Sequence, residues 1–121
     1  MRLWHYKLIP FLPRQQLLGQ HRECCALRGN GWGKKHSTVD YVFNYSQNVL
    51  CSFHHFVMRE MMIHGYKVSI DWLDWKYRGK SCPPREELDI ATNQITYPEH
   101  DEAYLQECIE NLRRKGIEIN V

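Results

Sequence analysis

The sequence predicts a mainly α-helical protein: a compact single-domain bundle of about three main helices, with an extended N-terminal arm and irregular loops. Two observations lead to this prediction. Apolar residues recur at three- and four-residue spacing in three separate stretches, and a glycine follows each stretch. The chain has 121 residues, of which 43% are hydrophobic, and it contains no internal repeat or low-complexity stretch. We therefore expect residues 1–121 to form one domain.

The first helix is expected to begin near Pro13, a residue suited to a first helical turn, and to run to about Arg28. A cluster of three glycines between residues 29 and 33 then ends it. Its apolar stripe consists of Leu17, Leu18, Cys24 and Cys25, with His21 between them. This stripe should face the core.

The second helix should follow the capping candidates Asn44 and Ser46 and end at Gly65. Its core face is predicted to hold Val49, Leu50, Phe53, Phe56, Val57 and Met61. The histidines at positions 54, 55 and 64 are interpreted as solvated or hydrogen-bonded side chains, because no paired acids or cysteines stand at metal-ligand spacing beside them.

The third helix should follow Pro98 and Asp101 and end before Gly116, with basic residues 113–115 at the negative end of its dipole. Its inward residues are predicted to be Tyr104, Leu105, Cys108, Ile109 and Leu112. Between the second and third helices, residues 66–75 fit either a strand or a short helix, and residues 80–98 are predicted to form a loop.

The composition narrows the classes of function. No apolar run approaches the ~18 residues of a membrane span, and the N-terminus lacks a cleavage pattern, so we expect a soluble and unprocessed protein. We also expect it to be cytoplasmic and monomeric. The five cysteines are odd in number and lack C-x-x-C spacing, which favours reduced thiols. Cys24, Cys25 and His21 could be metal ligands, but no second cluster completes a site. We expect no metal and no cofactor.

Charge is distributed unevenly along the chain although the net charge is only +2. Residues 1–36 hold seven Lys or Arg against one acid, whereas residues 86–121 hold three bases and nine acids. A basic N-terminal third can attract the phosphates of DNA, and the alternative is an ordinary solvated face. Within it, Arg28, Lys34, Lys35 and His36 flank a glycine-rich loop that we predict to contact a DNA backbone. Trp32 in this loop could insert into a strand or anchor the loop to the core.

Glu23 is the acid of this basic third, and it falls on the side of the first helix opposite the apolar stripe. Gly19, one turn earlier, costs a helix interior roughly 1 kcal/mol relative to alanine. Either close approach of a ligand beside Glu23 or tight helix packing could account for this glycine.

Several segments together resemble the pyrimidine-dimer DNA glycosylase family, of the phage endonuclease V type. They are Met1-Arg2-Leu3-Trp4, residues 12–23 (LPRQQLLGQHRE) with the glycine- and lysine-rich loop that follows, residues 60–66 (EMMIHGY) and residues 77–80 (YRGK). The resemblance implies a compact helical enzyme that acts on pyrimidine dimers or abasic sites in double-stranded DNA. Its N-terminal α-amine would attack the sugar C1′, and β-elimination from the resulting imine would cut the strand. By the same resemblance, Glu23 is the assisting carboxylate, and Arg2 and Arg22 hold phosphates.

The chemistry of a free terminus suits this reaction. An α-amine has an ordinary pKa of about 7.7 to 8.0, so a useful fraction is neutral and nucleophilic at pH 7, unlike a typical lysine. Arg2 is too large for the usual removal of Met1, so the amine of Met1 is the predicted nucleophile. The predicted function is a DNA-repair glycosylase and AP lyase. The alternatives are a non-enzymatic nucleic-acid-binding protein with the same fold and an interaction protein whose charge asymmetry is incidental.

Overall fold

The computed structural model describes residues 2–35, 38–88 and 96–120, and its described part is all helical. Three main helices, α1 (Arg14–Arg28), α2 (Gln47–Ile63) and α3 (Glu102–Arg114), alternate with short 3-10 helices. The 3-10 helices are η1 (Tyr6–Phe11), η2 (Asp40–Asn44) and η3 (Ile70–Leu73). The predicted helical class and the three main helices are confirmed.

The helix ends follow local capping. The Ser46 side chain accepts a hydrogen bond from the Asn48 N–H at the start of α2, and Asp101 accepts one from the Tyr104 N–H at the start of α3. Gly65 and Gly116, which follow these helices, both have a φ near +80°, the left-handed conformation that closes a helix C-terminus. At the end of α1, the Gly29 N–H donates to the Cys25 carbonyl. These caps explain why the predicted boundaries of the three main helices agree with the structure.

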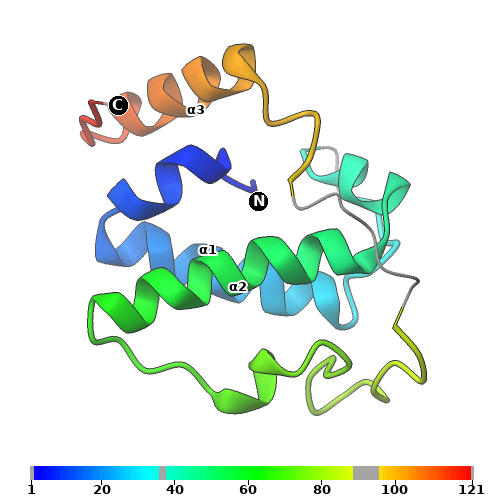
Figure 1. The fold of residues 1–121 in the computed structure, drawn as a ribbon. Helices are drawn as coiled ribbons and strands as arrows, with labels where there is room; N and C mark the ends of the chain where they lie inside the picture. The colour runs from blue at the N-terminus through cyan, green and yellow to red at the C-terminus, as the bar shows by residue number, and fades with distance from the viewer. Residues whose placement is uncertain (1, 36–37, 89–95, 121) are drawn as a thin grey trace.

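The helices are arranged in layers (Figure 1). α1 and α2 lie side by side and run in opposite directions. The N-terminal segment with η1 crosses above this pair, and α3 covers the N-terminal segment on its far side (Figure 1). The predicted N-terminal arm is free of helix over residues 2–5 and then winds into η1.

One buried cluster joins the layers. It takes Leu3 and Leu8 from the N-terminal segment and extends through all three main helices. From those helices the cluster includes Leu17, Cys24, Leu50, Phe53, Val57, Leu105, Cys108 and Leu112. The apolar spacing therefore predicted most buried residues of α2 and α3. On α1, Leu17 and Cys24 are buried as predicted, whereas Leu18 and Cys25 are only partly buried.

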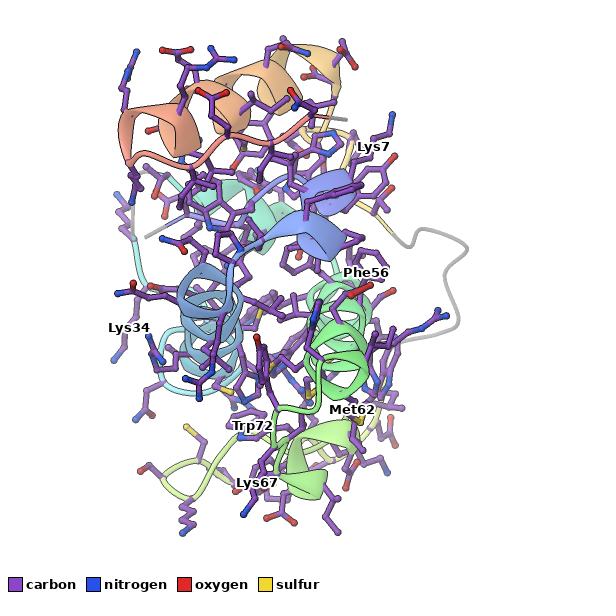
Figure 2. All side chains as sticks on the ribbon, turned by 90° about the vertical axis from the view of Figure 1, so that its left-hand side faces the viewer. Lys7, Lys34, Phe56, Met62, Lys67 and Trp72 are labelled. Carbon is purple, nitrogen blue, oxygen red and sulfur yellow. The ribbon has the colours of Figure 1, made fainter. Side chains whose placement is uncertain are left out.

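Residues 66–88 form a further layer on the opposite side of α1 and α2 from α3, and Trp72 lies in this layer (Figure 2). Of the two conformations that the sequence left open for residues 66–75, the structure has the helical one, as the single turn of η3. No helix in the described part of the chain is long and apolar enough to cross a membrane.

Candidate active site

A polar cavity of about 390 Å³ opens where the N-terminal arm, α1 and the end of α3 meet. Its lining includes Arg2 from the arm, Glu23 from α1 and Lys115 from the residue after α3. The remaining lining residues are Trp4, Gln16, Gly19, Gln20, Thr38 and Asn111. Two of the residues predicted from the sequence, Arg2 and Glu23, thus share one cavity although they are far apart in the chain. Met1, predicted to carry the nucleophile, lies outside the described residues.

The α1 side of this cavity follows from helical spacing. Gln16, Gly19, Gln20 and Glu23 occupy positions i, i+3, i+4 and i+7, which form one face of a helix. Glu23 is half-buried on this face. A carboxylate that is partly shielded from water and borders a cavity can exchange protons with a bound molecule or stabilise a cation there.

Gly19 borders the cavity and has open space around it. Among the described residues, a Cβ added at Gly19 would meet within 4 Å only the Arg22 Nη2, at 3.7 Å. Tight helix packing therefore does not explain this glycine in the described part of the chain. The other alternative, room for a ligand beside Glu23, agrees with the cavity.

Side chains from α1, α3 and the segment before α3 hold the N-terminal arm in place. The Gln20 side chain accepts from the Trp4 N–H at 2.6 Å and donates to the Arg2 carbonyl at 3.0 Å. On the α3 side, the Tyr104 hydroxyl donates to the Leu3 carbonyl. His100 accepts from the Tyr6 N–H through Nδ1 at 3.3 Å. These hydrogen bonds satisfy backbone groups of the arm and hold it in the position where it lines the cavity.

Positive charge gathers at the cavity rim. The Arg2 guanidinium lies 5.8 Å from the Trp4 ring centre, and the Lys115 ammonium lies at the same distance from that ring. Arg2 also lies 3.7 Å from the Glu107 carboxylate, an exposed partner that offsets its charge only in part. Two cations around one aromatic ring form a suitable surface for a phosphate group.

The other basic residues predicted to bind DNA are either exposed, outside the described residues or, in the case of Arg28, buried. Arg22 is exposed on α1, and Lys34 and Lys35 are exposed on the loop after it, where Lys34 points away from the helices (Figure 2). His36 lies outside the described residues. Trp32 is partly buried and meets the Phe43 ring edge-on at 5.1 Å, so of its two predicted roles the structure favours anchoring the loop.

The expectation that Arg28 contacts DNA is wrong in this structure, because its side chain is fully buried. Its guanidinium donates to the carbonyls of Trp72 and Asp74, each at 2.8 Å, and of Tyr77 at 3.2 Å. It thereby ties residues 72–77 to α1. A sequence signal was available, since Arg28 stands four residues after Cys24 and so belongs to the buried face of the helix.

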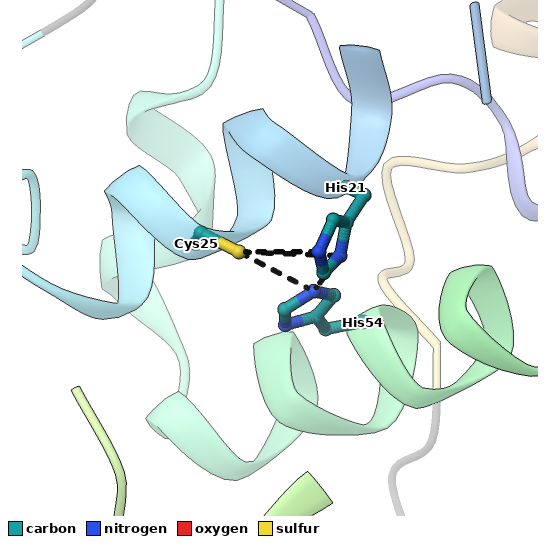
Figure 3. A group of neighbouring side chains, drawn as sticks. All are labelled: His21, Cys25 and His54. Atoms are coloured by element: carbon teal, nitrogen blue, oxygen red, sulfur yellow. Dashed lines mark hydrogen bonds between the residues drawn. The ribbon is translucent and has the colours of Figure 1, made fainter. Parts of the chain in front are cut away.

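His21 and Cys25 of α1 approach His54 of α2 closely (Figure 3). Their potential metal-ligating atoms lie within 4.8 Å of one another. However, Arg28 Nη1, which can only donate, lies 3.0 Å from His54 Nδ1. The proton of neutral His54 is therefore on Nε2, from which it donates to His21 Nδ1 at 2.8 Å. Burial lowers the pKa of His54 to about 2, which keeps the ring neutral. A proton occupies the nitrogen that a metal would need, so we interpret the group as a hydrogen-bonded chain.

Sequence reasoning missed four residues that the structure places at the cavity. Lys115 was explained by helix capping alone, and Gln20, Thr38 and Asn111 carried no signal of their own. Asn111 and Lys115 are one helical turn apart at the end of α3. Only the folded chain brings this turn beside the arm.

Comparison with known proteins identifies a protein family. The family model described as pyrimidine dimer DNA glycosylase matches residues 1–74. The matched region contains the arm, α1 with Glu23, the basic loop and α2. No curated protein and no solved structure matches the chain.

Proposed function

Because the chain belongs to the pyrimidine dimer DNA glycosylase family, we propose that it is a DNA-repair glycosylase with AP lyase activity on pyrimidine dimers or abasic sites. The observation that carries the proposal is the polar cavity shared by Arg2 and Glu23. In this cavity a carboxylate shares the lining with Arg2, the residue that follows the proposed nucleophile, which supports a mechanism based on the terminal amine. We further propose that residues 1–121 act as one domain and as a monomer.

The nucleophile in this proposal is the α-amine of Met1. Met1 is joined to Arg2, which lines the cavity, and the atoms of neighbouring residues are separated by only a few ångströms. The amine attacks the sugar C1′, and the bond from C1′ to the damaged base breaks. The nitrogen then loses a proton, the C1′–O4′ bond breaks and O4′ takes up a proton, so the opened sugar is held as a cationic imine, which water hydrolyses after strand cleavage to restore the amine. Removal of a proton from C2′ then expels the 3′ phosphate and cuts the strand.

Glu23 has two tasks in this scheme. Its carboxylate stabilises the positive charge that develops on the sugar and on the imine, and it accepts and returns protons at the reacting carbons. No metal or organic cofactor is required, since the enzyme's own amine forms the covalent bond. Half-burial of Glu23 strengthens its interaction with a cation relative to a fully solvated carboxylate.

DNA is held through its phosphates in this proposal. Arg2 and Arg22 are assigned to phosphates near the lesion, and Lys34, Lys35 and His36 to the backbone beyond it. Arg22 and the two lysines are exposed, and Arg2 borders the cavity, so the four described side chains are accessible from solvent. Their exposure supports this assignment.

The decisive substitution is Glu23→Gln, which keeps the shape of the side chain and removes its charge. Strand cleavage of abasic duplex DNA should fall by at least about 100-fold, while the melting temperature and the DNA affinity change little. Glu110→Gln is the matched control, since it removes the same charge from a partly exposed position on α3, where Glu110 pairs with Arg113. Equal activity of the two variants would remove Glu23 from the chemistry.

The nucleophile is tested by borohydride trapping on abasic DNA. Untagged protein should retain Met1 by intact mass and give a stable crosslink whose peptide map ends at Met1. Acetylation of the N-terminus should abolish the crosslink and leave salt-sensitive binding intact. A crosslink at a lysine would keep the lyase and discard Met1. No crosslink from untagged protein would favour the non-enzymatic DNA-binding alternative.

A further inference from the structure

Residues 2–5 of the arm, which lead to the proposed nucleophile, form no helix, and a buried glutamine fixes their backbone. We propose that Gln20 is a positioning residue, which holds the N-terminal arm at a fixed place beside Glu23 and thereby sets the rate of imine formation. This inference rests on the function proposed above. It adds a residue that does not touch the reacting atoms and acts through the backbone of the arm.

The Gln20 side chain is 1% exposed and bonds at both ends of its amide. Its oxygen accepts from the Trp4 N–H at 2.6 Å, and its nitrogen donates to the Arg2 carbonyl at 3.0 Å. These two groups of the arm bracket Leu3. The side-chain amide therefore pairs with the arm much as a neighbouring backbone would, and it fixes both the position and the direction of the arm.

Gln20 ties the arm to the helix that carries Glu23. The two residues are three apart on α1, which puts them on the same face of the helix, separated by a rise of about 4.5 Å. Both line the cavity. The bond at Gln20 thus fixes the arm relative to the carboxylate itself.

The clamped carbonyl is close to the amine along the chain. Between the Arg2 carbonyl and an α-amine on Met1, the backbone can rotate about only three bonds. These rotations are φ and ψ of Arg2 and ψ of Met1. Fixing that carbonyl therefore limits the positions that the α-amine can reach before DNA binds. Such preorganisation matters, since a displacement of about 1 Å between reacting groups can cost on the order of 100-fold in rate.

The arm has other attachments that do not reach Glu23. Tyr104 of α3 bonds the Leu3 carbonyl, and His100 before α3 bonds the Tyr6 N–H. When the Gln20 bonds are removed, these attachments should keep the arm folded on α3 while its distance from Glu23 varies. Loss of Gln20 should therefore slow the chemistry more than it weakens DNA binding.

The first test is Gln20→Met, which keeps the length of the side chain and removes both hydrogen bonds. Single-turnover borohydride trapping on abasic duplex DNA should slow by about 10- to 100-fold, with DNA affinity within about twofold of the wild type. Gln106→Met, the same change on the exposed face of α3, is the matched control and should trap at the wild-type rate. All rates are measured well below the melting temperature of each variant, so that loss of folded protein does not enter them.

The second test is Gln20→Glu, whose effect should depend on pH. An ionised carboxylate can accept from the Trp4 N–H but repels the Arg2 carbonyl, whereas a protonated one can both accept and donate. The ratio of variant to wild-type trapping rate should therefore rise as the pH is lowered from 8 towards 5. A merely structural role would move the melting temperature and leave this ratio flat.

The outcomes separate the two proposals. Wild-type trapping together with equal trapping by Gln20→Met would overturn the positioning role and keep the lyase. Absence of trapping by the wild type would instead refute the proposed function from which the positioning role follows. A lower melting temperature of Gln20→Met with an unchanged trapping rate would make Gln20 structural, which also overturns this inference.

Discussion

Replacing Arg28 by methionine should destabilise the protein by about 3 kcal/mol, because the guanidinium is fully buried and holds residues 72–77 on α1. The substitution removes four hydrogen bonds, three of them to main-chain carbonyls and one to His54 Nδ1. Hydrogen bonds from a charged donor contribute about 1.5 to 3 kcal/mol each before the cost of burying the charge is subtracted. Water can reach the partly buried carbonyls in the variant, so we take the lower end of the range for breaking a buried charged network.

The assay is chemical and thermal unfolding beside a matched variant, Arg22→Met, which makes the same change at an exposed position of the same helix. A loss of about 3 kcal/mol lowers the melting temperature of a chain of this size by roughly 10 °C. Arg22→Met should stay within about 0.5 kcal/mol of the wild type but bind DNA more weakly, with a salt slope smaller by about one. If Arg28→Met instead kept the wild-type melting temperature and showed the shallower salt slope, Arg28 would belong to the DNA interface and the buried network would not be the reason for its presence.

Three further predictions address the cavity, the basic loop and the buried histidines. Gly19→Ala should stabilise the helix by up to about 1 kcal/mol and slow single-turnover cleavage, because its methyl group enters the cavity; unchanged cleavage would mean that no ligand approaches there. Replacing Lys34 and Lys35 by alanine should lower the slope of log K against log salt by up to roughly two, and an unchanged slope would exclude this loop from binding. Burial lowers the pKa of His54 to about 2 and that of His100 to about 3, below their ordinary value of about 6.5, so both rings are neutral in the folded protein. Their contribution to stability is complete above pH 6.5 and is lost as the pH falls, by up to about 1.4 kcal/mol per pH unit for each ring. Urea unfolding between pH 7 and pH 4 measures this slope, which should be shallower in His100→Gln.

The three main helices could be predicted because their signals are local. Ser46 and Asp101 cap the helix that each precedes, and Gly65 and Gly116 supply the left-handed residue after each end. The apolar spacing also identified most of the buried face of α2 and α3, and part of that of α1. On that face, residues such as Leu17, Leu50 and Leu112 are fully buried.

The candidate site could be predicted only in part, since the signals for the rest are not local. Arg2 and Glu23 were selected because of the family resemblance and do share a cavity, while their chemical roles stay predictions. Lys115 reaches the same cavity from the far end of the chain, and helix capping already explained its charge. Gln20 was part of the quoted family segment, but its two bonds reach back 16 and 18 residues to a segment without regular structure. No periodicity encodes such a pairing.

Arg28 and Gln20 share a physical task that explains why one was misassigned and the other missed. Residues 72–77 and the N-terminal arm make few regular backbone hydrogen bonds. Side chains of α1 therefore satisfy some of their carbonyl and N–H groups. A polar side chain in this task is as buried as a leucine, while in the sequence it looks like a surface residue. The two side chains bond different segments. Gln20 bonds the arm beside the cavity, whereas Arg28 bonds the layer of residues 66–88 on the opposite side of α1 and α2. Loss of Arg28 should therefore lower stability without slowing imine formation in the folded protein, whereas loss of Gln20 should slow imine formation. The sites are separate, so their effects should combine additively in the double variant.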